Sequence, residues 1–275
     1  MKMKTKAIIL AALCGITAFA GENVDFTTKP AMEKLEGKAV PSFRILPENL
    51  KQDRFYRITL QVKMTEPGMI ASGIRRETEK SLWRASGSIG TEWQEFTLYV
   101  DPGEAWTCSL GARPKGNTFQ FKDLKIEEMG EEDLTKNLLP TLKGMDWHTV
   151  WSKTEAKIGF EKCKDSPFGS EVLAAEISEG TGYPATMSIP LIPGRTLVVN
   201  AWVKGEPDAI WWVSIKGCGS KKLPVTGEWR KQELRFQVKD DAPKSAVIVF
   251  FKKLKDGEDK MKCFFGKVEA YYEEK

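Results

Sequence analysis

Two ten-residue stretches decide the fold: residues 55–64, which read FYRITLQVKM, and residues 196–205, which read TLVVNAWVKG. Each has apolar residues at every second position and carries a Val-Lys pair near its end. Successive side chains of a β-strand point to opposite faces of its sheet, so this period of two predicts strands with one buried face.

The two stretches belong to an internal repeat. A second anchor, residues 91–96 (TEWQEF), matches residues 227–232 (GEWRKQ), and a third, residues 119–124 (FQFKDL), matches residues 263–268 (CFFGKV). The anchors occur in the same order in both copies, with modest differences in spacing. Self-similarity of this kind indicates two copies of one structural unit.

The pattern along the whole chain predicts an all-β protein. Alternating segments rich in Val, Ile, Phe and Tyr are separated by Gly and Pro, and no segment after residue 21 keeps a helical period over three turns. We therefore predict two tandem antiparallel β-sandwich domains of the jelly-roll type. They are placed at residues 21–129 and 134–275, joined by the acidic linker 130–133.

The first twenty residues have the features of a secretory signal peptide. Lys2, Lys4 and Lys6 precede an apolar run over residues 7–20 that ends in Ala-Phe-Ala, which predicts cleavage before Gly21. The run is shorter than the roughly 20 apolar residues of a membrane-spanning helix. We expect an exported bacterial protein, secreted or periplasmic, with no membrane span.

The charge balance disfavours two classes of partner. The chain has 42 Lys and Arg against 38 Asp and Glu. Three of the lysines lie in the signal peptide, so the mature part is nearly neutral. It therefore lacks the basic surplus typical of proteins that bind nucleic acid or anionic lipid.

Four cysteines remain after cleavage: Cys108, Cys163, Cys218 and Cys263. Export permits disulfides, and four cysteines allow three complete pairings that the sequence leaves open. Because three of the four lie in the second half, we predict at least one disulfide among those three.

The second half resembles a known family. Its motifs are, in order, NLLP from residue 137, PFGS from 167, IPLIPG from 189, AWVKG from 201 and TGEW from 226. This order resembles the carbohydrate-binding modules with a galactose-binding-like jelly roll that are often fused to xylanases and cellulases. The resemblance covers nearly all of residues 134–275, and the first half from about Phe43 onward. It implies two antiparallel sheets and frequently a sugar site, although the superfamily also includes structural members and members that bind proteins or lipids.

The resemblance also implies a structural calcium ion, which related modules often tie to their first and last strands. Asp123 stands where the last strand of the family commonly has Asp, whereas Lys267 takes that place in the second copy. Asp165 is the other candidate, since calcium prefers carboxylate and other oxygen ligands. No other cofactor is expected.

The sequence gives little support for catalysis. Its one histidine, His148, would have to serve any Ser-His-Asp or Cys-His site, and no nucleophile elbow, phosphate-binding loop or dinucleotide fingerprint accompanies it. A carboxylate pair acting as a glycan hydrolase or lyase stays an alternative, because such chemistry needs only two acidic side chains.

The nine tryptophans carry the functional argument. Sugars stack their flat C–H faces on aromatic rings while polar neighbours bind the hydroxyls. Trp93 and Trp229 recur at one place in both copies, which predicts a structural role in the fold. Trp211 shares its strand face with Val213 and Ile215, so we expect it in the core.

Trp202 and Trp212 alternate away from the core, beside Asn200 and Ser214 respectively. If residues 205–209 form a hairpin, the two rings lie opposite each other on one outward face. The first copy has Gln61 and Ala71 at these positions. The rings therefore form either a sugar-stacking surface or a surface covered by the other domain or by a loop.

Loop residues complete the candidate sugar site: Trp147, Trp151 and Tyr183. The favoured interpretation is a secreted, non-catalytic protein that binds a polysaccharide or other glycan, mainly through its second module. The alternative is a structural or adhesive envelope protein that contacts other proteins. Polar side chains beside the rings favour the first, and a broad apolar patch favours the second.

Overall fold

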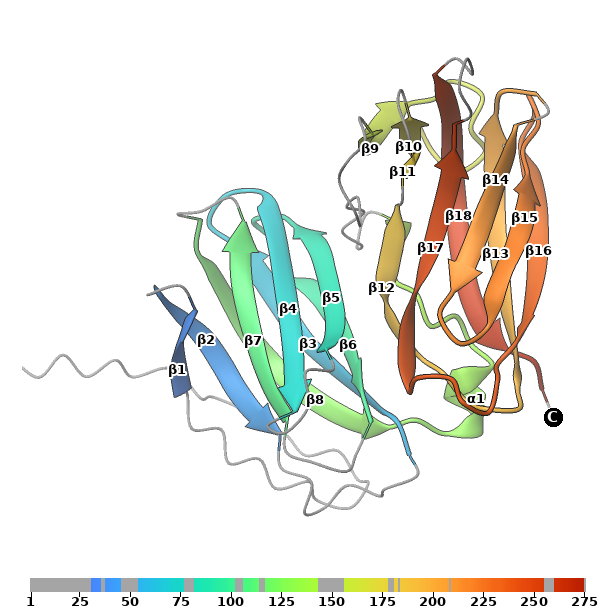
Figure 1. The fold of residues 1–275 in the computed structure, drawn as a ribbon. Coiled ribbons are helices and arrows are strands. Elements are labelled where there is room, and N and C mark those ends of the chain that lie inside the picture. Colours follow the sequence, from blue (N-terminus) through green and yellow to red (C-terminus); the bar gives the residue numbers. More distant parts are fainter. Residues whose placement is uncertain are drawn as a thin grey trace, which may run out of the picture.

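The computed structural model describes residues 31–35, 38–45, 54–76, 82–101, 106–113, 117–142, 156–177, 181–182, 184–207, 209–254 and 260–274. The predicted signal peptide lies outside these ranges. Within them the chain forms antiparallel β-sheets with a single short helix (Figure 1). The predicted all-β sandwich class is confirmed. No helix among the described residues is long and apolar enough to cross a membrane.

The N-terminal half contains two sheets, with strand orders β1-β2-β7-β4-β5 and β6-β3-β8. The strands are β1 (Ala31–Leu35), β2 (Lys38–Ile45), β3 (Tyr56–Met64), β4 (Gly68–Arg76), β5 (Leu82–Ile89), β6 (Gln94–Val100), β7 (Trp106–Arg113) and β8 (Phe119–Glu128).

The C-terminal half also contains two sheets. One has the order β16-β13-β18-β10-β9, and the other has the order β11-β17-β14-β15, with β12 also paired to β17. The strands are β9 (Ala156–Lys162), β10 (Glu171–Ile177), β11 (Thr181–Gly182), β12 (Ala185–Pro190), β13 (Thr196–Gly205), β14 (Ile210–Ile215), β15 (Gly219–Pro224), β16 (Arg230–Gln237), β17 (Ser245–Lys253) and β18 (Met261–Tyr272).

The first anchor of each repeat copy is the central strand of a three-strand group. In β3 the side chains alternate strictly between buried and half-buried, with Ile58, Leu60 and Val62 inside. In β13, Val199 and Ala201 point inward. Burial of a Val, Leu or Ile side chain contributes about 1.5–3 kcal/mol, which fixes the register of each strand with respect to the core.

The second and third anchors pair with these central strands in matching register. Gln61 of β3 lies opposite Glu95 of β6, and Trp202 of β13 lies opposite Lys231 of β16. Along the third anchor, Met64 pairs with Phe119 and Gly205 pairs with Cys263. The three pairs of anchors therefore take equivalent places in the two halves.

A β-bulge interrupts the third anchor in both halves. In β18 the extra residue is Gly266, because Val203 pairs with Phe265 and Trp202 already pairs with Lys267. In β8 the irregularity lies between the partners of Thr59 and Gln61, and Asp123 there has a φ of 52°. Asp is one of the few non-glycine residues that enter this left-handed region readily, whereas Gly266 in the other bulge does not have a positive φ.

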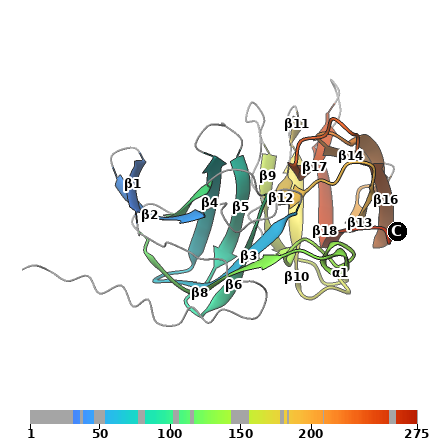
Figure 2. The same ribbon diagram turned by 90° about the horizontal axis from the view of Figure 1, so that it is seen from below.

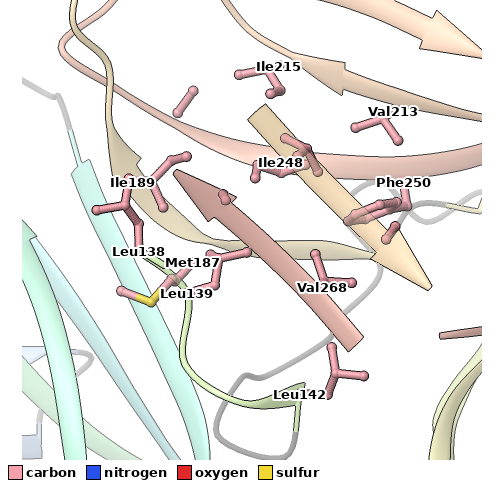
Figure 3. Packing of buried hydrophobic residues seen from close by; sticks show 14 of the residues in the cluster. Leu138, Leu139, Leu142, Met187, Ile189, Val213, Ile215, Ile248, Phe250 and Val268 are labelled. Atoms are coloured by element: carbon pink, nitrogen blue, oxygen red, sulfur yellow. The ribbon is translucent and has the colours of Figure 1, made fainter. Parts of the chain in front are cut away.

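The two halves contact each other through β12 and the connector. Strand β12 is buried along its whole length and lies beside β5 and β6 (Figures 1 and 2). Helix α1 (Glu131–Leu134) overlaps the predicted linker, and Leu138 and Leu139 beyond it join the same buried cluster as Met187 (Figure 3). An ion pair of 3.0 Å between Lys244 Nζ and Asp101 Oδ2 also crosses between the halves.

The predicted hairpin at residues 205–209 is wrong. Strand β13 pairs with β16 and β18, whereas β14 pairs with β15 and β17, so the two strands lie in different sheets of the sandwich. Alternation fixes which side chains point inward but not which sheet a strand joins. Residues 205–209 therefore carry the chain from one sheet to the other.

The predicted disulfide among Cys163, Cys218 and Cys263 is also wrong, since all three are free thiols. Cys163 Sγ lies 3.1 Å from Asp165 Oδ1 in the turn after β9, and Cys218 lies in the turn between β14 and β15. Cys263 is enclosed in the core, where burial raises the pKa of its thiol well above the ordinary value. The side chain of Cys108 lies outside the described part.

We propose that each half is a separately folding domain, with the boundary at residues 130–133. A fragment of residues 134–275 should then unfold cooperatively, at a lower midpoint than residues 21–275 because it lacks the β5 and β6 cover of β12. Thermal unfolding followed by circular dichroism, with residues 21–275 as reference, measures this. A fragment without a cooperative transition would show that the halves fold only together.

Candidate functional site

The residues predicted to bind a sugar fall on two separate surfaces. Trp212 and Ser214 lie on the outer side of the β11-β17-β14-β15 sheet, and Trp202 and Asn200 lie on the outer side of the opposite sheet. Because two sheets and the core lie between them, these four side chains do not form one site.

We call the first surface the Trp212 face: Trp212, Ser214, Ser220, Lys222 and Phe251. The Trp212 ring lies nearly parallel to that of Phe251, its partner on β17, with centroids 6.4 Å apart and planes 20° apart. Both side chains are half-buried. The two rings stack on each other, and both stay partly open to solvent, so an open ring face can stack on a planar ligand.

Polar groups adjoin these rings. Ser220 Oγ donates a hydrogen bond of 2.9 Å to Ser214 Oγ, one pleat along the same side of β14. Lys222, opposite Trp212 on β15, places its ammonium 5.9 Å from the ring centroid. Two hydroxyls and one ammonium beside an aromatic surface match the mixed character of sugar sites.

Trp211, the sequence neighbour of Trp212, points the other way. It is 0 % exposed and meets Phe265 edge-to-face, with centroids 6.1 Å apart. The prediction that Trp211 belongs to the core is confirmed.

We call the second surface the Trp202 face: Trp202, Phe168, Trp229, Lys231 and Lys267. The lysines are the cross-strand partners of Trp202, and their ammonium groups lie 5.3 and 5.2 Å from its ring centroid. Phe168 packs edge-on against both Trp202 and Trp229. Two lysines and a second aromatic ring therefore surround Trp202, whereas a single lysine lies over Trp212, at a longer distance.

Asn200 lies beside Trp202 but is only 2 % exposed. Its Nδ2 donates to the Tyr271 hydroxyl at 3.1 Å. Its cross-strand neighbours are Glu233 and Glu269. In this arrangement Asn200 helps to hold the outer layer of the sheet together.

The two recurring tryptophans differ in environment. Trp229 is half-buried against Phe168, as expected for a structural residue. Trp93 is 36 % exposed and lies under the ammonium groups of Lys63 and Lys122, at 4.9 and 4.5 Å. The predicted structural role of Trp93 stays a prediction: two lysines lie over its ring, and no sequence pattern marked its exposure.

The two calcium candidates have other partners. Asp123 occupies the β8 bulge, 3.8 Å from the Lys122 ammonium. Asp165 bonds to the Lys204 ammonium and to the Cys163 thiol, and these bonds lower the pKa of its carboxyl. No group of three or more His, Cys, Asp or Glu side chains that could hold a metal ion occurs in the part of the chain that the structure describes.

Four loop residues singled out from the sequence lie outside the described residues: Trp147, His148, Trp151 and Tyr183. Strand β11, just before Tyr183, pairs with Lys252 and Lys253 of β17. It thus joins the strand that carries Phe251.

No family model matches the sequence, and no curated protein matches it. The similar solved structures are mostly carbohydrate-binding modules. A family 4 module matches with 13% identity and a TM-score of 0.33, over 45% of this chain and 81% of its own. A family 61 module bound to β-1,4-galactotriose matches with 18% identity and a TM-score of 0.34, over 46% and 88%. The family 11 module of a cellulosomal cellulase of Clostridium thermocellum matches with 12% identity and a TM-score of 0.35, over 50% and 94%.

Two enzyme structures match over small parts of their length: an arabinofuranosidase over 27% of its chain and a xanthan lyase over 22%. Their TM-scores are 0.41 and 0.26. Likeness at these scores carries no argument about ligand or activity.

The packing of Phe168 on the Trp202 face requires a glycine at position 266. A Cβ at this position would lie 2.1 Å from Phe168 Cδ2, so Gly266→Ala must displace the Phe168 ring from both tryptophans. We expect a loss of about 1–3 kcal/mol in the free energy of unfolding. Urea unfolding of residues 21–275 measures it.

Gly159→Ala is the matched control, since a Cβ on Gly159 of β9 meets nothing within 4 Å. It should leave the stability unchanged or raise it by up to about 1 kcal/mol. Equal losses in both variants would mean that Phe168 does not rest on Gly266.

Proposed function

We propose that this is an exported, non-catalytic glycan-binding protein whose C-terminal domain binds polysaccharide on the Trp212 face. The observation that carries the proposal is the pair of nearly parallel rings, Trp212 and Phe251, on the outward side of two neighbouring strands.

Core packing does not account for this pair. The interior of the same sheet is filled by Trp211, Val213 and Phe250, each 0 % exposed. Side chains of β14 alternate, so Trp212 points away from that interior. An aromatic surface that the core does not require is available to stack on the C–H face of a sugar ring.

The surroundings favour a glycan over a protein partner. Ser214, Ser220 and Lys222 place hydroxyl and ammonium groups next to the rings, where sugar hydroxyls need donors and acceptors. Ile210, 41 % exposed at the start of β14, is the feature that favours the adhesive alternative, because exposed apolar surface is typical of protein interfaces.

Trp212→Ala should weaken retention of a bound polysaccharide in affinity gel electrophoresis. Loss of one stacking ring costs about 0.5–1.5 kcal/mol, which is up to about tenfold in dissociation constant. The free energy of unfolding should fall by no more than about 1 kcal/mol. The gel panel should include β-glucans, xylans, galactans and mannans.

Trp211→Ala, at the neighbouring position in the sequence, is the matched control. It should lower the free energy of unfolding by about 3–5 kcal/mol because that ring is fully enclosed.

Trp202→Ala tests the opposite sheet and should leave polysaccharide retention unchanged. Full retention in Trp212→Ala, together with loss in Trp202→Ala, would move the site to the Trp202 face. A panel in which no polysaccharide is retained would favour the adhesive alternative.

A further inference from the structure

The N-terminal half contains a pocket of about 430 Å³ that the proposal above does not use. Its floor is the outer side of the β6-β3-β8 sheet, and one wall is the connector at residues 137–140. Ligand pockets for small molecules commonly have volumes of about 300–1,000 Å³. The space therefore fits a ligand of mono- to disaccharide size.

The hollow exists because two floor residues are short. Thr59 and Thr97 lie opposite each other, and the equivalent pair in the C-terminal half is Asn200 and Glu233. There Arg235 bonds to Glu233 at 2.8 and 3.0 Å, and Asn200 below is only 2 % exposed. Threonine side chains cannot cover the equivalent area, so the sheet surface stays open.

The wall of the pocket is held by both halves. The Tyr99 hydroxyl donates to the Leu138 carbonyl at 2.8 Å, and Leu138 N donates to the Ala270 carbonyl at 2.7 Å. Asn137 fixes the turn through bonds of its side-chain amide to both backbone groups of Leu139. A pocket built on such bonds is formed before a ligand arrives, which lowers the entropic cost of binding.

The charges of the lining balance. Arg57 and Lys125 contribute two positive charges, and Glu95 and Glu127 contribute two negative charges. Arg57 is already paired with Glu127 at 3.2 Å and with Asp133 at 3.4 Å. A net charge of zero with interspersed donors and acceptors suits a neutral ligand with many hydroxyls, since each hydroxyl both donates and accepts.

An exposed ring lies further along the same sheet. Glu95 of the lining pairs with Gln61. Trp93 precedes Glu95 by two residues, and its side chain is 36 % exposed. Lys63 and Lys122 flank its ring. These lysines lie over the ring, as two lysines do on the Trp202 face, so Trp93 adds no open stacking surface to the pocket.

We infer that this pocket is a second ligand site, for a neutral, polyhydroxylated molecule of mono- to disaccharide size. It is independent of the Trp212 face, so either site can exist without the other. Arg57 and Lys125 would donate to ligand oxygens, Glu95 and Glu127 would accept from ligand hydroxyls, and the threonine hydroxyls would do both.

The test is a titration of the ¹⁵N-labelled mature protein, followed by NMR, with glucose, galactose, xylose, arabinose, cellobiose and lactose as probes. We expect at least one of these sugars to shift the backbone amide signals of Thr59, Thr97 and Lys125 in a saturable way. Glucuronate and glucosamine, which carry a charge, should bind more weakly than their neutral counterpart. Equal or tighter binding of a charged sugar at these amides would contradict the neutral class of ligand.

The variant Thr59→Asn/Thr97→Glu copies the residues of the C-terminal half, which fill the equivalent surface there. It should weaken sugar binding by about tenfold or more. Thr97→Val, which keeps the shape and removes one hydroxyl, is the milder second variant and should also weaken binding. Trp212→Ala should leave these shifts unchanged, so failure of this site and failure of the proposed polysaccharide site are distinguishable. The inference is overturned if no sugar shifts these amides, or if both pocket variants bind as the parent does.

Discussion

In the central strand β3, burial of every second side chain places all the others. Ile58, Leu60 and Val62 there, like Val199 and Ala201 on β13, are at most 1 % exposed. Slipping β3 by one residue would turn its buried side chains to water and bring polar ones inside. The outward positions, including Thr59, Gln61 and Trp202, therefore follow from the core. They can vary between the halves without disturbing it.

The two halves use this freedom differently on equivalent surfaces. In the C-terminal half the outward side chains pair with one another: Arg235 with Glu233, and Lys231 and Lys267 with the Trp202 ring. In the N-terminal half the equivalents of Asn200 and Glu233 are threonines, and a pocket opens there. Exposed ion pairs contribute about 0–1 kcal/mol each, so exchanging them for an open surface costs little stability.

The connector between the two halves packs against both of them. Arg195, in the C-terminal half, contacts Glu131 of α1 at 2.8 Å, and Asp101, 3 % exposed at its side chain, meets Lys244. A carboxylate that is nearly enclosed is costly to leave without its cation. The Arg195 contact holds the connector against the C-terminal half, and the bond from the Tyr99 hydroxyl to the Leu138 carbonyl holds it against the N-terminal half, where it forms a wall of the pocket. The Lys244–Asp101 pair joins the two halves directly.

The sequence by itself determined the β class, the anchors of the repeat and the direction of side chains such as Trp211 and Trp212, because alternation and burial are local properties of a strand. It could not determine which sheet a strand joins, so Trp202 and Trp212, expected side by side, lie on opposite sheets. It also gave no sign that Trp93 is exposed under two lysines, or that the Thr59–Thr97 pair opens a pocket. These features depend on strands distant in sequence and on the connector laid across them, and only the tertiary structure brings those segments together.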